Sequence, residues 1–191
     1  MNPVLIVYAT REGHTQRVAA QLAEDLRARG VQTVVRPVEG MTAQDSLASY
    51  AAVLLAASVH AGRHEPEMIR FVRERLSELE RVNSSFLSVT LSEAGVERSD
   101  ATPVQHATFV ADVDAMIQRF IDDTGWHPRR IKNVAGALLY TRYNFLVRLV
   151  MKRIARTSGG STDTSADHDY TDWADLDRFA ETIAADVKSA G

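Results

Sequence analysis

The chain has 191 residues, of which 45% are hydrophobic and 25% are charged, and its formal net charge is −3. These values are typical of a single soluble globular domain. The absence of cysteine excludes disulfides, thiolate catalysis and Cys-ligated metal centres, so redox chemistry requires a bound cofactor. No run reaches the roughly 18 apolar residues of a membrane span, and the chain enters a strand without a basic leader, so we expect a cytoplasmic protein.

The N-terminal stretch combines a short apolar run over residues 4–8 with a polar turn and the start of a helical pattern. The turn has the composition of a phosphate-binding loop, because Thr10 and Thr15 provide hydroxyl groups and Gly13 lets the backbone approach an anion. It lacks the glycine and lysine patterns of ATP-binding and dinucleotide-binding loops, which favours a phosphate monoester. An ordinary helix N-terminus is the alternative, and the turn alone does not decide between the two.

Helical and strand patterns alternate along the rest of the chain. The run over residues 51–57 is almost continuously apolar, as is typical of a central parallel strand covered on both faces. Segments 39–49 and 92–102 are polar and are expected to be irregular, with room for one helical turn in the first. In chain order, we expect a helix over 15–29, strands over 31–35 and 51–57, a helix over 66–79, a strand over 85–91, a helix over 104–123, a strand over 134–140 and a helix from 173 capped by Asp172.

These elements predict one α/β domain over residues 1–191. Five strands alternating with helices favour a doubly wound parallel sheet in the flavodoxin-like order 2-1-3-4-5. In that order, a ligand binds at the carboxyl ends of the first and third strands. The loops 10–15 and 58–64 follow those strands, and the loop 90–92 lies next to them. The topology therefore predicts one ligand crevice lined by three loops that are far apart in the sequence.

A basic segment interrupts the alternation after the fifth strand. Residues 125–162 contain no Asp or Glu and carry a charge of +8, whereas the rest of the chain carries −11. Within an insertion over about 141–171, residues 143–156 are expected to form a basic amphipathic helix. The helix could be a solvated face, a nucleic-acid patch, or a contact with anionic lipid or substrate carboxylates. The absence of a nucleic-acid motif and the apolar stripe beside the cations favour the last of these. The residues assigned to substrate or membrane contact are Tyr140, Arg142, Tyr143, Arg148, Lys152, Arg153 and Arg156.

The chain resembles a known family along almost its entire length. The turn 10–15 resembles the FMN phosphate loop of the flavodoxins. Further matches are the segment 57–62, Gly-Ala-Leu-Leu-Tyr at 136–140, Ser-Gly-Gly-Ser-Thr-Asp-Thr at 158–164 and Tyr-Thr-Asp-Trp at 170–173, which resemble the menaquinone-dependent protoporphyrinogen IX oxidases. The resemblance implies an FMN enzyme of heme biosynthesis that oxidises protoporphyrinogen IX and passes electrons to a quinone. The basic segment 143–156 leads us to expect peripheral attachment to the inner face of the cell membrane. The alternative is a flavodoxin-type carrier that shuttles electrons between soluble partners.

The resemblance also implies which residues surround FMN. The loops 58–64 and 90–92 contain no Phe, Tyr or Trp, so we expect one face of the flavin ring to be open to a large planar substrate. His60 is the candidate catalytic residue, as a proton donor, although a solvated loop histidine is the alternative. The histidines are scattered, so no metal site is expected. The residues assigned to cofactor binding are Thr10, Arg11, Glu12, Gly13, His14, Thr15, Ser58, Val59, His60, Ala61, Gly62, Thr90, Leu91 and Ser92.

Overall fold

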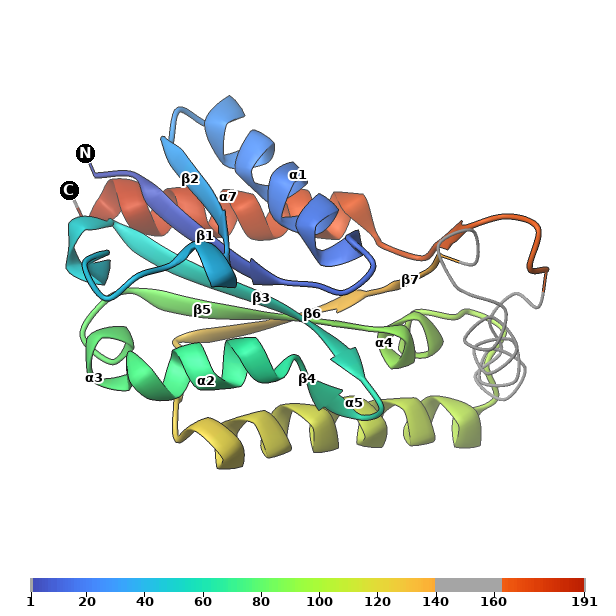
Figure 1. Ribbon diagram of the computed structural model, residues 1–191. Helices are drawn as coiled ribbons and strands as arrows, with labels where there is room; N and C mark the ends of the chain where they lie inside the picture. The colour runs from blue at the N-terminus through green and yellow to red at the C-terminus, as the bar shows by residue number, and fades with distance from the viewer. Residues whose placement is uncertain (1, 140–162, 191) are drawn as a thin grey trace.

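A computed structural model of the chain describes residues 2–139 and 163–190. Its main sheet has the strand order β2-β1-β3-β5-β6, and these five strands are parallel to one another. This arrangement is the predicted flavodoxin-like order, because β4 is only a short return strand beside β3 (Figure 1). The five parallel strands are β1 (Val4–Ala9), β2 (Thr33–Pro37), β3 (Ala52–His60), β5 (Ser84–Thr90) and β6 (Arg130–Ala135).

Helices cover both faces of the sheet, as Figure 1 shows. On one face lie α1 (His14–Ala28) and α7 (Trp173–Ser189), and on the other lie α2 (Pro66–Glu74), α3 (Leu76–Leu79) and α5 (Pro103–Thr124). The shorter elements are the 3-10 turns η1 (Val38–Gly40) and η2 (Leu47–Ser49), the helix α4 (Leu91–Val96) and the strands β4 (Arg63–His64), β7 (Ala137–Leu138) and β8 (His168–Asp169). In the described ranges, no helix is both long and apolar enough to cross a bilayer.

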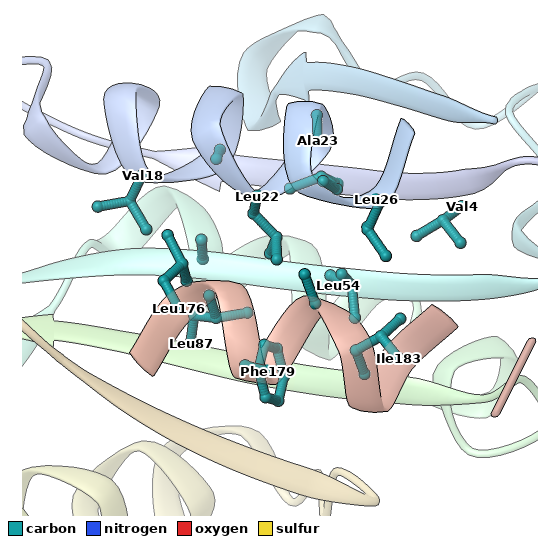
Figure 2. Close-up of a cluster of buried hydrophobic side chains, with 14 of the residues drawn as sticks. Val4, Val18, Leu22, Ala23, Leu26, Leu54, Leu87, Leu176, Phe179 and Ile183 are labelled. Carbon is teal, nitrogen blue, oxygen red and sulfur yellow. The ribbon is translucent and has the colours of Figure 1, made fainter. Parts of the chain in front are cut away.

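The apolar run of β1 explains why the sheet needs two helical layers. Val4 and Ile6 belong to the core under α1 and α7, whereas Leu5 and Val7 belong to the core under α2 and α5. All four side chains are fully buried, and each such burial contributes about 1.5–3 kcal/mol to folding. Figure 2 shows the first of these cores, where side chains of α1 and α7 meet Leu54 of the central strand. The carboxyl end of β1 is therefore held rigidly in place.

The fifth parallel strand differs from its prediction. It runs over Arg130–Ala135 rather than 134–140, because its charged side chains conceal the strand pattern in the sequence. Arg130 forms an ion pair with Asp186, and Lys132 forms one with Asp175, both on α7. After Gly136 the chain leaves the parallel sheet, and β7 pairs antiparallel with β8 just before α7. The predicted basic helix 143–156 lies outside the described residues, as do all seven of the assigned contact residues between 140 and 156.

Three other segments also differ from the expected elements. The expected helix over 66–79 breaks at Arg75, whose guanidinium donates to the main-chain oxygens of Thr42 and Asp45. The segment 92–102 is not wholly irregular, because Thr90 caps the helix α4 by accepting a hydrogen bond from the N–H of Ser92. The loop 58–64 is a hairpin in which β3 continues to residue 60 and returns as β4. The predicted start of the last helix is confirmed, since the side chain of Asp172 caps α7.

Candidate cofactor site

A pocket of about 220 Å³ opens where the parallel strands β1, β3 and β5 end. The turn after β1, the β3–β4 hairpin and the start of α4 contribute to its wall, so the structure brings the three predicted loops together. Of the residues assigned to cofactor binding, only Arg11 and Gly13 do not line the pocket. The lining residues are Thr10, Glu12, His14, Thr15, Ser58, Val59, His60, Ala61, Gly62, Val89, Thr90, Leu91, Ser92, Met116, Gly136, Ala137 and Leu139.

The turn after β1 forms one end of the pocket. Gly13, at the N-cap of α1, has a φ of 89°, a value that favours glycine, and its N–H donates to the hydroxyl of Thr10 over 3.0 Å. No side chain caps the N-terminus of α1, so its first N–H groups are available to an anion. Arg11 does not line the pocket, and its Nε instead donates to Glu65 at 2.8 Å. This end of the pocket therefore offers neutral donors and a helix dipole.

Thr15 provides the test of whether a phosphate fits this end. Its side chain is fully buried, lines the pocket, and its hydroxyl has no hydrogen-bond partner among the described residues. A buried hydroxyl without a partner costs about 1–3 kcal/mol, so such groups are rarely left unpaired. A phosphate monoester accepts hydrogen bonds and would remove this cost. The residues present therefore fit the phosphate group of a flavin mononucleotide.

The β3–β4 hairpin and the start of α4 form the other end of the pocket. The hairpin turns through Ala61 and Gly62, which both have positive φ, as a two-residue type I′ turn requires. The lining residues of the described chain include no Phe, Tyr or Trp. Met116 of α5 closes the wall behind Thr90, whose hydroxyl lies 3.6 Å from the methionine sulfur. This end is therefore bounded by small aliphatic and hydroxyl side chains.

Gly136 allows the chain to pass very close to this end. A Cβ atom at this position would lie 3.3 Å from the carbonyl carbon of Thr90 and 3.4 Å from the amide nitrogen of Leu91. The N–H of Gly136 donates to the carbonyl oxygen of Thr90 over 3.0 Å. A larger residue would therefore require the backbone around Thr90 and Leu91 to shift by a few tenths of an ångström.

His60 stands between two carboxylates at the mouth of the pocket. Its Nε2 lies 3.2 Å from Glu12 Oε2 and 3.3 Å from Glu65 Oε1. Glu65 is 2% exposed and also accepts a hydrogen bond of 2.8 Å from Ser58 Oγ. The hydrogen bond to Glu12 raises the pKa of His60 above its ordinary value, although burial acts in the opposite direction. The arrangement favours an imidazolium at the edge of the pocket.

His64 has a different environment although it lies only four residues further along the hairpin. Its ring is 3% exposed and packs edge-on against Phe86 and Phe120, with Nε2 2.9 Å from Ser88 Oγ. Burial lowers the pKa of His64 to about 4, so the ring is neutral near pH 7. His64 is therefore a core residue of the α2–α5 face.

The phosphate-loop end is supported by the C-terminal segment. The Nε2 of His14 lies 2.9 Å from the hydroxyl of Thr171, and that hydroxyl donates to the main-chain oxygen of Ala135 over 2.8 Å. Because the hydroxyl has one proton, His14 must donate from Nε2, which fixes its tautomer. Arg17 forms a 2.9 Å ion pair with Asp169 and its guanidinium lies 4.9 Å from the ring centre of Trp173. The Tyr-Thr-Asp-Trp segment therefore links α1 to the end of β6.

Sequence reasoning missed several residues of the site. Glu65 was not assigned a role, although a carboxylate directly before the proline that begins a helix is a usable signal. Gly136 was also missed, although a glycine after a predicted strand signals close backbone approach. Met116 has no local signal, because it reaches the site through tertiary packing, and the Tyr-Thr-Asp-Trp segment marks Thr171 only as part of a family match, without indicating its contact with His14.

The chain is similar to flavodoxins both in sequence and in fold. A family profile described as a flavodoxin domain matches residues 5–165. The rubredoxin:oxygen oxidoreductase of Desulfovibrio gigas superimposes with a TM-score of 0.54 at 14% identity, covering 99% of this chain and 37% of that one. A flavodoxin from Pseudomonas aeruginosa superimposes with a TM-score of 0.52 at 14% identity, covering 97% and 99%. At these identities, the structural similarity supports the fold alone.

Two curated relatives align with nearly all of the chain. The protoporphyrinogen IX dehydrogenase (quinone) of Leishmania major is 34% identical over 185 residues, which cover 95% of this chain and 74% of the relative. The protein of the same name from Escherichia coli K12 is 32% identical over 180 residues, covering 94% and 93%. The chain therefore belongs to the flavodoxin-domain family, and within it to the group whose curated members are named protoporphyrinogen IX dehydrogenase (quinone).

Proposed function

We propose that this protein is an FMN-dependent oxidoreductase that converts protoporphyrinogen IX into protoporphyrin IX and passes the reducing equivalents to a quinone. The names of the two relatives support the reaction. The observation that carries the proposal is the pocket at the strand ends. Among the described residues, the Thr15 hydroxyl there has no hydrogen-bond partner and the wall contains no Phe, Tyr or Trp. The first feature suits a flavin phosphate, and the second suits a flavin ring that must admit a second planar molecule.

We assign the phosphate of FMN to the turn after β1 and the flavin ring to the opposite end. Thr10, Thr15 and the N-terminal N–H groups of α1 would hold the phosphate. The hairpin residues 58–62 and the residues 90–92 would border the ring. When bound, FMN would accept hydride equivalents from the porphyrinogen and pass them on to the quinone, while the protein supplies orientation and electrostatics.

His60 is the residue that we assign to proton handling. Its position between Glu12 and Glu65 keeps a proton on the imidazole at pH values where an isolated histidine would lose it. The exposed fraction of its side chain is 39%, so a substrate can reach it. Each proton released as the porphyrinogen is oxidised must leave through the site, and His60 with Glu12 is a route to solvent.

The open end of the pocket favours an enzyme over a one-electron carrier. Val59, Ala61 and Leu91 line this end with aliphatic side chains, whereas an aromatic cover would protect the ring of a carrier from substrate. A flavodoxin-type carrier is the alternative function, and the assay must distinguish it from the enzyme. Carrier function would require reduced flavin to pass electrons to soluble acceptors without turning over the porphyrinogen.

We also propose that the protein works in the cytoplasm, attached peripherally to the membrane that contains the quinone. The basic segment 143–156, with Arg148, Lys152, Arg153 and Arg156, is the assigned contact. Each cation near an anionic leaflet contributes about 1 kcal/mol, so attachment should be reversed by salt. Co-sedimentation with vesicles tests this: replacing these four residues by Gln should abolish binding to anionic vesicles, and equal binding to neutral vesicles would refute it.

The reaction is tested with the FMN-loaded protein under anaerobic conditions. Protoporphyrinogen IX and a menaquinone analogue are added, and the appearance of porphyrin fluorescence is followed. We expect formation of porphyrin that depends on both the protein and the quinone. Porphyrin formation no faster than in the protein-free control, together with rapid electron transfer to a generic one-electron acceptor, would favour the carrier.

A further inference from the structure

A second and larger pocket lies beside the β3–β4 hairpin, on the face of the sheet covered by α2 and α5. Its volume is about 590 Å³, which is within the range of roughly 300–1,000 Å³ that is usual for ligand pockets. His60 lines both this pocket and the cofactor pocket, so the two adjoin at that side chain. No role in the proposed reaction has been assigned to this pocket so far.

The outward face of α2 forms one wall of the second pocket. Met68, Phe71 and Val72 of this helix are buried in the core. The opposite face leaves an apolar strip beside charged groups, and its residues that line the pocket are Pro66, Ile69, Arg70, Arg73 and Glu74. Arg70 and Arg73 are three positions apart, so they project from the same side of the helix.

Four arginines line this pocket, and two of them already have a carboxylate partner. Arg11 pairs with Glu65 at 2.8 Å, and Arg63 pairs with Asp123 at 2.7 Å. The remaining two are those of α2, Arg70 and Arg73, which face one further carboxylate, Glu74. His60 at the border adds positive charge when it is protonated, whereas the buried His64 does not.

Arg70 and Arg73 have donors to spare. Among the described residues, Arg70 has no side-chain partner, and Arg73 uses only Nε, which donates to the main-chain oxygen of Asp123. A guanidinium with two unused edge donors binds a carboxylate in a bidentate manner. The pair therefore offers two carboxylate-binding groups beside an apolar surface at Ile69.

We propose that this arginine groove, defined by Arg11, Arg63, Arg70 and Arg73, binds the carboxylates of a dicarboxylic tetrapyrrole, with Arg70 and Arg73 as the anion-binding residues. This inference rests on the proposed function, whose substrate carries two propionates that project from one side of the macrocycle. Propionates held in the groove place the macrocycle toward His60, where the groove meets the cofactor pocket. The groove thus selects for acidic tetrapyrroles and orients them.

Neutralising both arginines tests the groove. In the FMN-loaded variant R70Q/R73Q, we expect KM for protoporphyrinogen IX to rise about 5- to 10-fold, the size expected from losing two solvent-exposed charge pairs. The KM for the quinone should not change. The matched control R81Q/K188Q removes the same charge at two exposed positions outside the groove, and it should leave every kinetic constant unchanged.

The dimethyl ester of the substrate separates carboxylate recognition from other effects of the substitutions. Wild-type protein should show a raised KM for the ester, and R70Q/R73Q should show no further rise, because the partner groups are already absent. An unchanged KM for the diacid in the variant, or an equal rise for diacid and ester, would overturn the proposal.

Product binding distinguishes failure of the groove from failure of the proposed reaction. Protoporphyrin IX and its dimethyl ester are titrated into FMN-loaded protein while the flavin fluorescence is followed. Wild-type protein should prefer the diacid, and R70Q/R73Q should lose the preference. If the protein prefers the diacid but does not oxidise protoporphyrinogen IX, the proposed reaction is wrong and the proposed role of the groove stands. If the protein oxidises protoporphyrinogen IX but shows no preference for the diacid, the proposed reaction stands and the proposed role of the groove is wrong.

Discussion

The two ends of the cofactor pocket are built differently. At the phosphate end, Thr15 is fully buried, and His14 is held by Thr171 from the far end of the chain. At the ring end, a two-residue hairpin and the short helix α4 form the wall, and the titratable group there is the partly exposed His60. On the proposed placement of FMN, binding strength and chemistry are separated between the two ends of this site. The phosphate end should set the affinity for FMN, and the ring end should set what the flavin does.

Replacing Thr15 by Val should give the largest effect. The change removes the hydroxyl that has no partner in the described structure, so FMN affinity should fall by about 10- to 100-fold, as expected for the loss of a buried hydrogen bond to a charged group. The apoprotein should be as stable as wild type or more stable, because a buried unpaired hydroxyl has been removed. Fluorescence titration with FMN and urea unfolding of the apoprotein measure the two quantities.

Thr33→Val is the matched control for that experiment. The hydroxyl of Thr33 is also buried without a partner among the described residues, but it lies in β2 and does not line the pocket. This variant should bind FMN as wild type does. Equal loss of affinity in both variants would show that Thr15 acts through the sheet rather than on the phosphate.

Replacing Thr171 by Val should have the next largest effect. Loss of the link between His14 and Ala135 should weaken FMN binding about 3- to 10-fold, because one buried hydrogen-bond network is broken without contact to the ligand. Thr171→Ser keeps the hydroxyl and should restore the affinity. If the Ser variant binds as weakly as the Val variant, packing of the methyl group rather than the hydroxyl is responsible.

Glu12→Gln, in the turn after β1, should change the pH dependence of His60 at the ring end. The hydrogen bond to Glu12 raises the pKa of His60, so the variant should titrate His60 at a lower pH. The stabilisation that this contact provides is present below the ordinary histidine pKa and is lost as pH rises through the raised value. NMR titration of the imidazole measures the shift, with His64, whose pKa is about 4, as the internal reference.

The smallest expected effect concerns α4, the helix that supports the ring end. Burial, together with the charges of Glu93 and Asp172, raises the pKa of Glu97 to about 7. The protonated form therefore stabilises the fold below pH 4.5, and this contribution is lost as pH rises through 7. Glu97 is only partly buried, and more than about a third of its surface is exposed, so solvent screening limits the effect. Glu97→Gln should therefore stabilise the protein by less than about 1 kcal/mol at pH 8. Urea unfolding at pH 8 and pH 5 should show the gain only at the higher pH.

The sequence predicts the sheet order and the meeting of the three loops, because apolar runs and short polar turns are local signals. Val4 to Val7 and the run at 52–57 are buried on both faces, as their composition indicates. Residue contacts that depend on distant partners could not be predicted. The sequence of β6 does not resemble a buried strand, because the ion pairs of Arg130 and Lys132 with carboxylates of α7 form only in the folded protein. Likewise, nothing near Thr171 in the sequence indicates that it contacts His14.

The bond between His14 and Thr171 joins residues that are 157 positions apart, and this separation has a consequence for biosynthesis. The ribosome makes the loop 10–15 well before its supporting residue Thr171, so the loop gains this support only after the chain has grown by 157 positions beyond His14. Contacts of such long sequence separation are among the slowest to form. We therefore expect stable FMN binding to follow the synthesis of Thr171, and a nascent chain that ends before Thr171 should retain the cofactor poorly.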